Sequence, residues 1–174
     1  VPEANYLYGI KCLENNKYAR GITYLKIAAV FEHSKAIYKL ADIEYSNACR
    51  KYVNPDERTE KSINIAFQLY QYLLNKNPHD NDVIEKLGQM YYWRKDYRKS
   101  RELLEKCTSA EALFTCGRMY QYGNGVAQDI YKARDLFKSA SNKGHIRAKV
   151  EYEKVCGWIS SNNVKNTYSK SRDY

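Results

Sequence analysis

Apolar side chains recur along this chain with the spacing of an α-helix. Within residues 83–107, one stripe comprises Ile84, Leu87, Gly88 and Tyr91, and a second comprises Ser100, Leu103, Leu104 and Cys107. Positions i, i+3, i+4 and i+7 share one face of a helix, so each stripe predicts one amphipathic helix. The two stripes together predict a helical hairpin.

This hairpin is repeated along the sequence. Each copy opens with a small residue, which we call the anchor of the repeat, and has a Gly or Ala five positions later. The pattern fits Ala4…Gly9, Ala36…Ala41, Val83…Gly88 and Ala112…Gly117, and Ala148 opens a partial copy. Small residues where two helices cross let the helix axes approach closely, which explains why the pattern recurs.

The repeats predict one helical domain over residues 1–159. Its repeats cover 4–35, 36–82, 83–111 and 112–147, with a partial repeat at 148–159. The second repeat carries an insertion at 46–61 that contains the turn signal Asn54-Pro55-Asp56. In the fourth repeat, Asp129 stands at the N-cap position of the second helix. Residues 160–174 are rich in Ser, Asn and Lys, and we expect a disordered polar tail there.

One copy has a recognisable family pattern. Its residues Ala112-Leu-Phe-Thr-Cys-Gly117, Tyr122-Gly-Asn-Gly-Val126, Lys132-Ala133 and Gly144-His145 resemble a complete Sel-1-like repeat. The shorter copies resemble tetratricopeptide repeats instead. The resemblance implies an all-α fold, a right-handed α-solenoid of four to five antiparallel helix pairs whose first helices line the concave face. It also implies a scaffold or adaptor for protein–protein interaction.

Composition agrees with a helical protein and raises the question of partners. The chain of 174 residues has only 3 prolines and 8 glycines, but 18 tyrosines. The net charge is +9, and the excess of basic residues is concentrated after residue 111. Such an excess attracts acidic proteins or nucleic acid. The 5 cysteines show no paired spacing, which favours a reducing, cytoplasmic compartment.

Residues opposite the packing stripes of the first helices are the candidate contacts. Tyrosine supplies a large contact area and a hydroxyl group at low entropic cost, as a peptide-binding groove requires. Trp93 is a further candidate anchor, whereas Trp158 is expected to cap the end of the array. The predicted partner-binding residues are Tyr6, Tyr38, Asp42, Tyr45, Gln89, Tyr92, Trp93, Arg118 and Tyr122.

The sequence does not indicate an enzyme. It has no Cys–His pair, no nucleophile elbow and no phosphate-binding glycine loop, and Gly123-Asn-Gly125 is explained by the repeat. His33 and His145 each lie three residues before an anchor, and His79 lies four before Val83, so the histidines belong to repeat turns. We therefore expect no catalytic residue, no metal and no cofactor.

Three other functional interpretations remain open. The basic surface of residues 132–154, which includes Lys138 and Arg147, could bind single-stranded nucleic acid. The chain could be a regulatory repeat domain of a larger enzyme or signalling protein. A partner could also dock on the convex surface or an edge, including the 46–61 insertion. We expect protein or peptide partners, no membrane insertion, and possible homo-oligomers through the terminal repeats.

Overall fold

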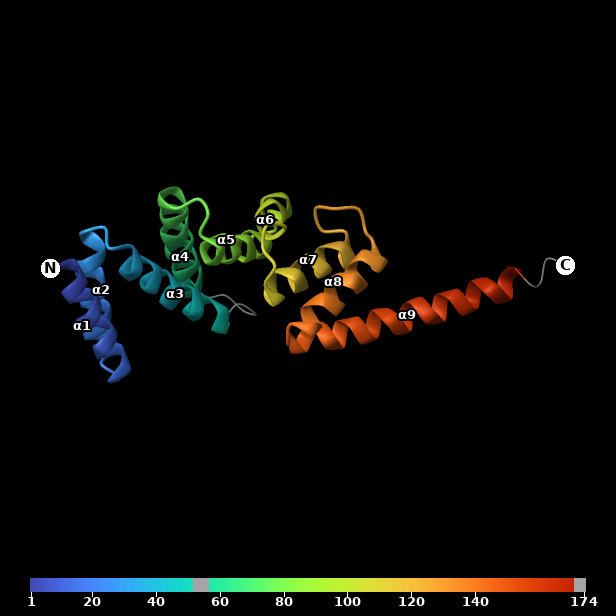
Figure 1. Ribbon diagram of the computed structural model, residues 1–174, viewed down its shortest axis with the longest axis horizontal. Coiled ribbons are helices and arrows are strands. Elements are labelled where there is room, and N and C mark those ends of the chain that lie inside the picture. Colours follow the sequence, from blue (N-terminus) through green and yellow to red (C-terminus); the bar gives the residue numbers. More distant parts are fainter. Residues whose placement is uncertain (52–56, 171–174) are drawn as a thin grey trace. The chain divides into compact units, whose positions relative to one another are not determined.

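The chain folds into helices that follow one another in antiparallel pairs (Figure 1). The computed structural model describes residues 1–51 and 57–170. Over this part of the chain the helices are α1 (Pro2–Glu14), α2 (Tyr18–Val30), α3 (Ser34–Lys51), α4 (Glu57–Lys76), α5 (Asn81–Trp93), α6 (Tyr97–Leu104), α7 (Ala110–Tyr122), α8 (Ile130–Asn142) and α9 (Ile146–Lys170). The expectation of an all-α fold built of helix pairs is confirmed.

The helices form two compact units, Val1–Leu87 and Gly88–Tyr174. In unit 1, α1 packs on α2, α2 on α3, and α3 on α4. In unit 2, α6 packs on α7, α7 on α8, and α8 on α9. Each unit has a core of buried apolar side chains, around Leu25 and Ala28 in unit 1 and around Phe137 and Ala140 in unit 2.

In every repeat but the first, the side chain three residues before the anchor caps the first helix. It accepts a hydrogen bond from the backbone N–H of the anchor, which is the N-cap interaction that satisfies an otherwise unpaired donor. The acceptor-to-nitrogen distances are 3.2 Å for His33–Ala36, 3.2 Å for Asp80–Val83, 3.1 Å for Ser109–Ala112 and 3.0 Å for His145–Ala148. Asp129 caps α8 in the same way, as predicted, through the N–H of Lys132 at 2.9 Å.

The small residues lie where paired helices approach most closely. A Cβ atom added to Gly117 would stand 2.6 Å from Cε1 of Phe137 on the partner helix α8. One added to Gly21 would stand 3.0 Å from the carbonyl oxygen of Gly9. Both distances are shorter than van der Waals contact, so the packing explanation for the small residues of the repeat is confirmed.

The loop of residues 123–129 packs against the beginning of α6. Gly123 ends α7 in the left-handed conformation, and Gly125 also has a positive φ of 68°. A Cβ atom on Gly125 would stand 2.6 Å from Cβ of Tyr97. Glycine is therefore required at position 125 both by the backbone conformation and by this close approach.

Two segments differ from the sequence-based expectation. Most of the 46–61 insertion extends α3 and α4, which have 18 and 20 residues, whereas Asn54-Pro55-Asp56 lies outside the described residues. Helix α9 continues to Lys170, although we expected a disordered tail from residue 160. The sequence has no Pro or Gly after Gly157 that would end this helix.

Candidate partner-binding surface

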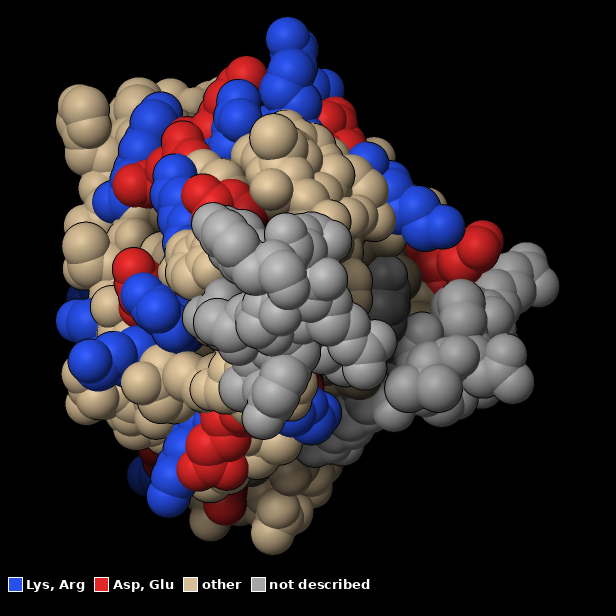
Figure 2. Space-filling view, turned by 90° about the vertical axis from the view of Figure 1, so that its right-hand side faces the viewer, with Lys and Arg blue, Asp and Glu red and all other residues tan. Residues whose placement is uncertain are grey.

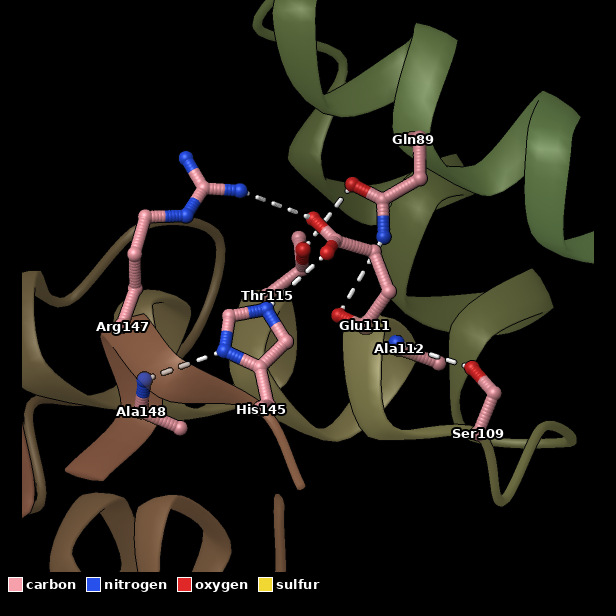
Figure 3. Close-up of polar contacts among 8 residues, drawn as sticks. All are labelled: Gln89, Ser109, Glu111, Ala112, Thr115, His145, Arg147 and Ala148. Atoms are coloured by element: carbon pink, nitrogen blue, oxygen red, sulfur yellow. Dashed lines mark hydrogen bonds and ion pairs between the residues drawn. The ribbon is translucent and has the colours of Figure 1, made fainter. Parts of the chain in front are cut away.

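A Glu–His pair joins successive repeats in each unit. In unit 2, Nε2 of His145 lies 2.9 Å from Oε2 of Glu111 (Figure 3). The imidazole also stacks on Phe114, with ring centroids 4.3 Å apart. In unit 1, Nε2 of His33 lies 2.6 Å from Oε2 of Glu3, and the imidazole stacks on Tyr6 at 4.8 Å. The glutamate of each pair directly precedes an anchor and the histidine lies three residues before the next one, so both pairs occupy the same register positions.

The hydrogen bonds of each histidine define a structural role. Nδ1 accepts the N-cap hydrogen bond from the anchor N–H, so the neutral imidazole carries its proton on Nε2 and donates it to the glutamate. The hydrogen bond from His33 holds the pKa of Glu3 below its usual range. Because both ring nitrogens are occupied, neither imidazole can act as a general base in this arrangement.

Three of the predicted contact residues meet in unit 2. The guanidinium carbon of Arg118 lies 5.7 Å from the ring centroid of Tyr92 and 5.9 Å from that of Tyr122. Tyr92 also contacts the ring of Tyr97 edge-on at 5.5 Å, and burial raises the pKa of Tyr92. The C-terminal halves of α5 and α7 thus carry one aromatic and cationic cluster.

Two other predicted contacts have different surroundings. Gln89 is buried, accepts a hydrogen bond from Thr115 Oγ1 at 2.9 Å, and donates through Nε2 to the carbonyl oxygen of Glu111 at 3.4 Å (Figure 3). Its amide therefore ties α5 to α7. Trp93 is half-buried at the last position of α5.

The predicted contacts of unit 1 gather around a buried tyrosine. Tyr38 and Tyr45 meet the ring of Tyr70 edge-on at 5.9 and 6.2 Å, and the Tyr70 hydroxyl donates to Oδ1 of Asp42 at 2.6 Å. Burial raises the pKa of Tyr38 to about 12, with Asp42 adding to the effect, and burial also raises the pKa of Tyr70. Tyr6 lies apart from this group, against His33.

Unit 2 has a groove between α7, the start of α8 and α9, which we call the α7–α9 groove. Its volume is about 490 Å³. It is lined by Gln121, Tyr122, Gln128, Ile130, Lys154, Val155 and Trp158. Tyr122 is 58% exposed and Trp158 is 57% exposed, whereas Val155 is buried. The groove therefore combines an apolar base with two accessible aromatic rings.

A buried acceptor without a partner lies in the lining of this groove. Gln121 Oε1 is inaccessible to solvent and receives no hydrogen bond, whereas its Nε2 faces Oε2 of Glu151 at 3.5 Å. The ion pair between Glu151 and Lys154, at 2.8 Å, lowers the pKa of the carboxyl group. Leaving a buried acceptor unpaired costs about 1–3 kcal/mol.

Unit 1 has a second groove beside α3, which we call the α3 groove. Its volume is about 680 Å³. Its apolar lining comprises Leu13, Tyr18, Ile22 and Ile43, and its polar lining comprises Lys39, Asp42, Ser46, Asn47 and Lys86. Its lining includes Asp42, one of the predicted contacts. Nζ of Lys86, which also lines the groove, lies 4.6 Å from the ring centroid of Tyr45.

The two grooves occupy the same position of the repeat. Counted from the anchors, Leu13 corresponds to Gln121, Asp42 to Lys154, Ile43 to Val155 and Ser46 to Trp158. Tyr18 corresponds to Ile130 once the longer loop of the fourth repeat is allowed for. Each groove thus lies between the end of one first helix, the start of its partner and the next first helix.

The structure places Trp158, which was expected to cap the end of the array, in the lining of the α7–α9 groove. Tyr122, Trp93 and Trp158 all stand ten residues after an anchor, namely Ala112, Val83 and Ala148. An aromatic residue at one register position of three repeats indicates a shared environment. The weak pattern of the last repeat, in which Glu153 replaces the small residue, obscures this register in the sequence.

Most basic side chains of residues 132–154 that the structure describes are engaged locally. Arg134 pairs with Asp135 at 2.7 Å, Arg147 with Glu111 at 3.6 Å, and Lys154 with Glu151 at 2.8 Å. Nζ of Lys132 donates to the Tyr120 hydroxyl at 2.6 Å. Figure 2 shows Lys and Arg side chains interspersed with Asp and Glu on the face that it draws. Local pairing therefore offsets part of the basic charge of this segment.

The described residues contain neither a metal-binding cluster nor a helix able to span a membrane. Over 1–51 and 57–170, no group of three or more His, Cys, Asp or Glu side chains converges as a metal site would require. Within the same part of the chain, no helix has the length and apolarity needed to cross a bilayer.

Comparison with solved structures defines the class of protein. The chain is a helical repeat protein, and 89% of it matches, with a TM-score of 0.63 and 20% sequence identity, a protective antigen present in uropathogenic Escherichia coli strains whose crystal structure displays an SLR fold. The chain has this Sel1-like repeat fold, and it spans 33% of the length of that antigen. The fold-level resemblance inferred from the sequence is confirmed.

Comparison with curated sequences gives a distant relative. The chain is 29% identical over 105 residues to the ERAD-associated E3 ubiquitin-protein ligase component HRD3 of Candida glabrata. This alignment covers 59% of the chain but only 12% of the relative. No protein-family model matches the sequence.

Proposed function

We propose that this chain is a non-catalytic interaction module that binds a segment of a partner protein, either a peptide or a helix. The repeat fold and the distant relative support a scaffold role. The binding surface would lie on the first helices of the repeats, α5, α7 and α9 in unit 2. In this proposal the α7–α9 groove is its centre, and the cluster of Arg118 with Tyr92 and Tyr122 extends it.

The observation that carries the proposal is the composition of the α7–α9 groove. Two accessible aromatic rings, Tyr122 and Trp158, flank an apolar base, and residues of this kind dominate the energetics of protein interfaces. We leave Gln89 out of the contact set because its amide is already occupied inside the unit.

Affinity purification of the full chain followed by mass spectrometry tests this proposal. Partners should be retained by the wild-type chain and lost with the Tyr122→Ala/Trp158→Ala variant. Tyr131→Ala is the matched control, since Tyr131 is 52% exposed but does not line the groove. Circular dichroism verifies that each variant keeps its helices. If the double variant retains every partner, the groove is not the binding site.

A second proposal concerns the assembly in which the module acts. Sequence similarity to a component of an ERAD-associated E3 ubiquitin-protein ligase supports a role as an interaction module of a ubiquitin-ligase complex. The chain would then be a non-catalytic domain of a larger assembly. Recovery of a ubiquitin ligase with the wild-type chain, dependent on the α7–α9 groove, would support this role. Partners without any ubiquitin-ligase subunit would contradict it.

A further inference from the structure

The α3 groove has the repeat position of the α7–α9 groove but a different chemical character. Where the α7–α9 groove has Trp158, the α3 groove has Ser46, and where one has Lys154 the other has Asp42. The apolar side chains Ile43 and Val155 correspond in the two grooves. The repeat therefore supplies the same cavity twice, and the substitutions around its edge determine what each copy can bind.

The charged groups of the α3 groove differ in whether they have a polar partner. Asp42 already accepts a hydrogen bond from the Tyr70 hydroxyl at 2.6 Å. Lys39 and Lys86 line the groove, and within the described residues no carboxylate lies within ion-pair distance of either ammonium group. Lys86 has an aromatic neighbour instead, 4.6 Å from its Nζ to the ring centroid of Tyr45. In the described part of the chain, two cations without a carboxylate at ion-pair distance thus border an apolar surface whose lining also includes Asp42.

Three other acidic residues of unit 1 act on α3 without lining the groove. Asp80, Asp82 and Glu85 act on Tyr38, where they help to raise its pKa, but none of the three lines the groove. The apolar lining is provided by Leu13, Ile22 and Ile43, together with the exposed ring of Tyr18. A ligand that fits this lining needs apolar side chains beside at least one carboxylate.

We propose that the α3 groove binds an acidic amphipathic segment of a partner protein. A carboxylate of the segment pairs with Lys39 and Lys86, and a neighbouring aliphatic or aromatic side chain packs on Leu13, Ile22 and Ile43. Opposite charges across an interface raise the association rate and select among partners, while the apolar contact supplies most of the affinity. This site is separate from the α7–α9 groove, so it goes beyond the function proposed above.

Peptide selection isolates this groove from the other one. Phage-displayed random 12-residue peptides are selected on the full-length Tyr122→Ala/Trp158→Ala chain, so that the α7–α9 groove does not compete. The selected peptides should be enriched in Asp or Glu next to Leu, Ile or Phe. Their affinity should fall about tenfold or more in the Lys39→Glu/Lys86→Glu variant and should decrease with added salt. Lys26→Glu/Lys61→Glu is the control of equal charge change, since neither residue lines the groove.

A charge swap makes the result specific. Peptides in which Lys replaces the selected acidic residues should bind the Lys39→Glu/Lys86→Glu variant better than the unsubstituted groove. Failure to select any peptide, selection of peptides without acidic residues, or equal binding to the reversed groove would each overturn the proposal. The α7–α9 proposal is unaffected by these outcomes, because that groove has been removed from the selection.

Discussion

Nε2 of His145 lies 2.9 Å from Oε2 of Glu111, while Nδ1 of the same ring accepts the backbone N–H of Ala148 at 3.0 Å. One imidazole therefore caps α9 and ties it to the start of α7. His33 does the same between Glu3 and Ala36 in unit 1. In each unit this side chain therefore joins the first turns of two successive first helices.

Replacing this histidine should destabilise unit 2. His145→Ala removes the N-cap acceptor, and we expect a loss of about 1–2 kcal/mol in the free energy of unfolding, measured with urea. His145→Ser should recover most of it, since Ser109 caps α7 from the same register position. His79→Ala is the control: His79 is exposed and lies outside that register, so its change should stay within about 0.5 kcal/mol. Equal losses in all three variants would contradict the capping role.

Two helical glycines with different surroundings should respond oppositely to replacement by alanine: Gly117 lies at the close crossing of α7 and α8, whereas Gly157 lies on an open face of α9. Gly117→Ala places a Cβ atom 2.6 Å from Cε1 of Phe137, and the resulting overpacking should cost about 1–3 kcal/mol. Gly157→Ala in α9 meets no atom within 4 Å and should stabilise the helix by about 0.5–1 kcal/mol. Urea unfolding of both variants distinguishes the two cases. An unchanged free energy of unfolding in Gly117→Ala would instead show that α7 and α8 can move apart without cost.

Cysteine reactivity should follow burial. Cys116 is 6% exposed, and burial raises the pKa of its thiol to about 12, so the reactive thiolate is scarce at pH 8. We expect iodoacetamide to modify the exposed Cys49 well before Cys116, as followed by peptide mass spectrometry. Addition of urea should abolish the difference. Early modification of Cys116 in the folded chain would contradict its place in the core.

The tyrosine group of unit 1 predicts a loss of stability at high pH. The pKa of Tyr38 is raised to about 12 in the folded chain, above its usual value near 10, so between these values the folded state binds a proton that the unfolded state releases. The contribution of Tyr38 to the free energy of unfolding is thus fully present below pH 10 and is lost as the pH rises toward 12. In urea unfolding at pH 9 and 11, Tyr38→Phe should show a smaller decrease than the wild-type chain. An identical decrease would show that Tyr38 ionises freely.

The sequence predicted the helical repeats because their determinants are local. The stripe of Ile84, Leu87 and Tyr91 and the small residue Gly88 define a helix and its contact face without any knowledge of distant residues. The resemblance to Sel-1-like repeats depended on one well-formed copy, residues 112–148. The extension of α3 and α4 into the insertion was missed because helix ends are weakly encoded when no breaker is present.

The candidate site was predicted less completely because it depends on contacts between repeats. Arg118, Tyr92 and Tyr122 do lie together, as their positions on neighbouring first helices suggested. Gln89 could not be placed in the interior from the sequence, since its burial depends on Thr115 and on the backbone of Glu111. The unpaired acceptor of Gln121 and the cationic edge of the α3 groove likewise require the three-dimensional arrangement.

Photocrosslinking from the α7–α9 groove tests the central claim most directly. A benzoylphenylalanine replaces Trp158, or Tyr131 as the control, and the full chain is irradiated with the partners recovered by affinity purification. We predict that position 158 yields a partner crosslink, that Tyr122→Ala abolishes it, and that position 131 yields none. Crosslinks of equal yield from both positions, or from position 131 alone, would contradict the assignment of the groove as the partner-binding site.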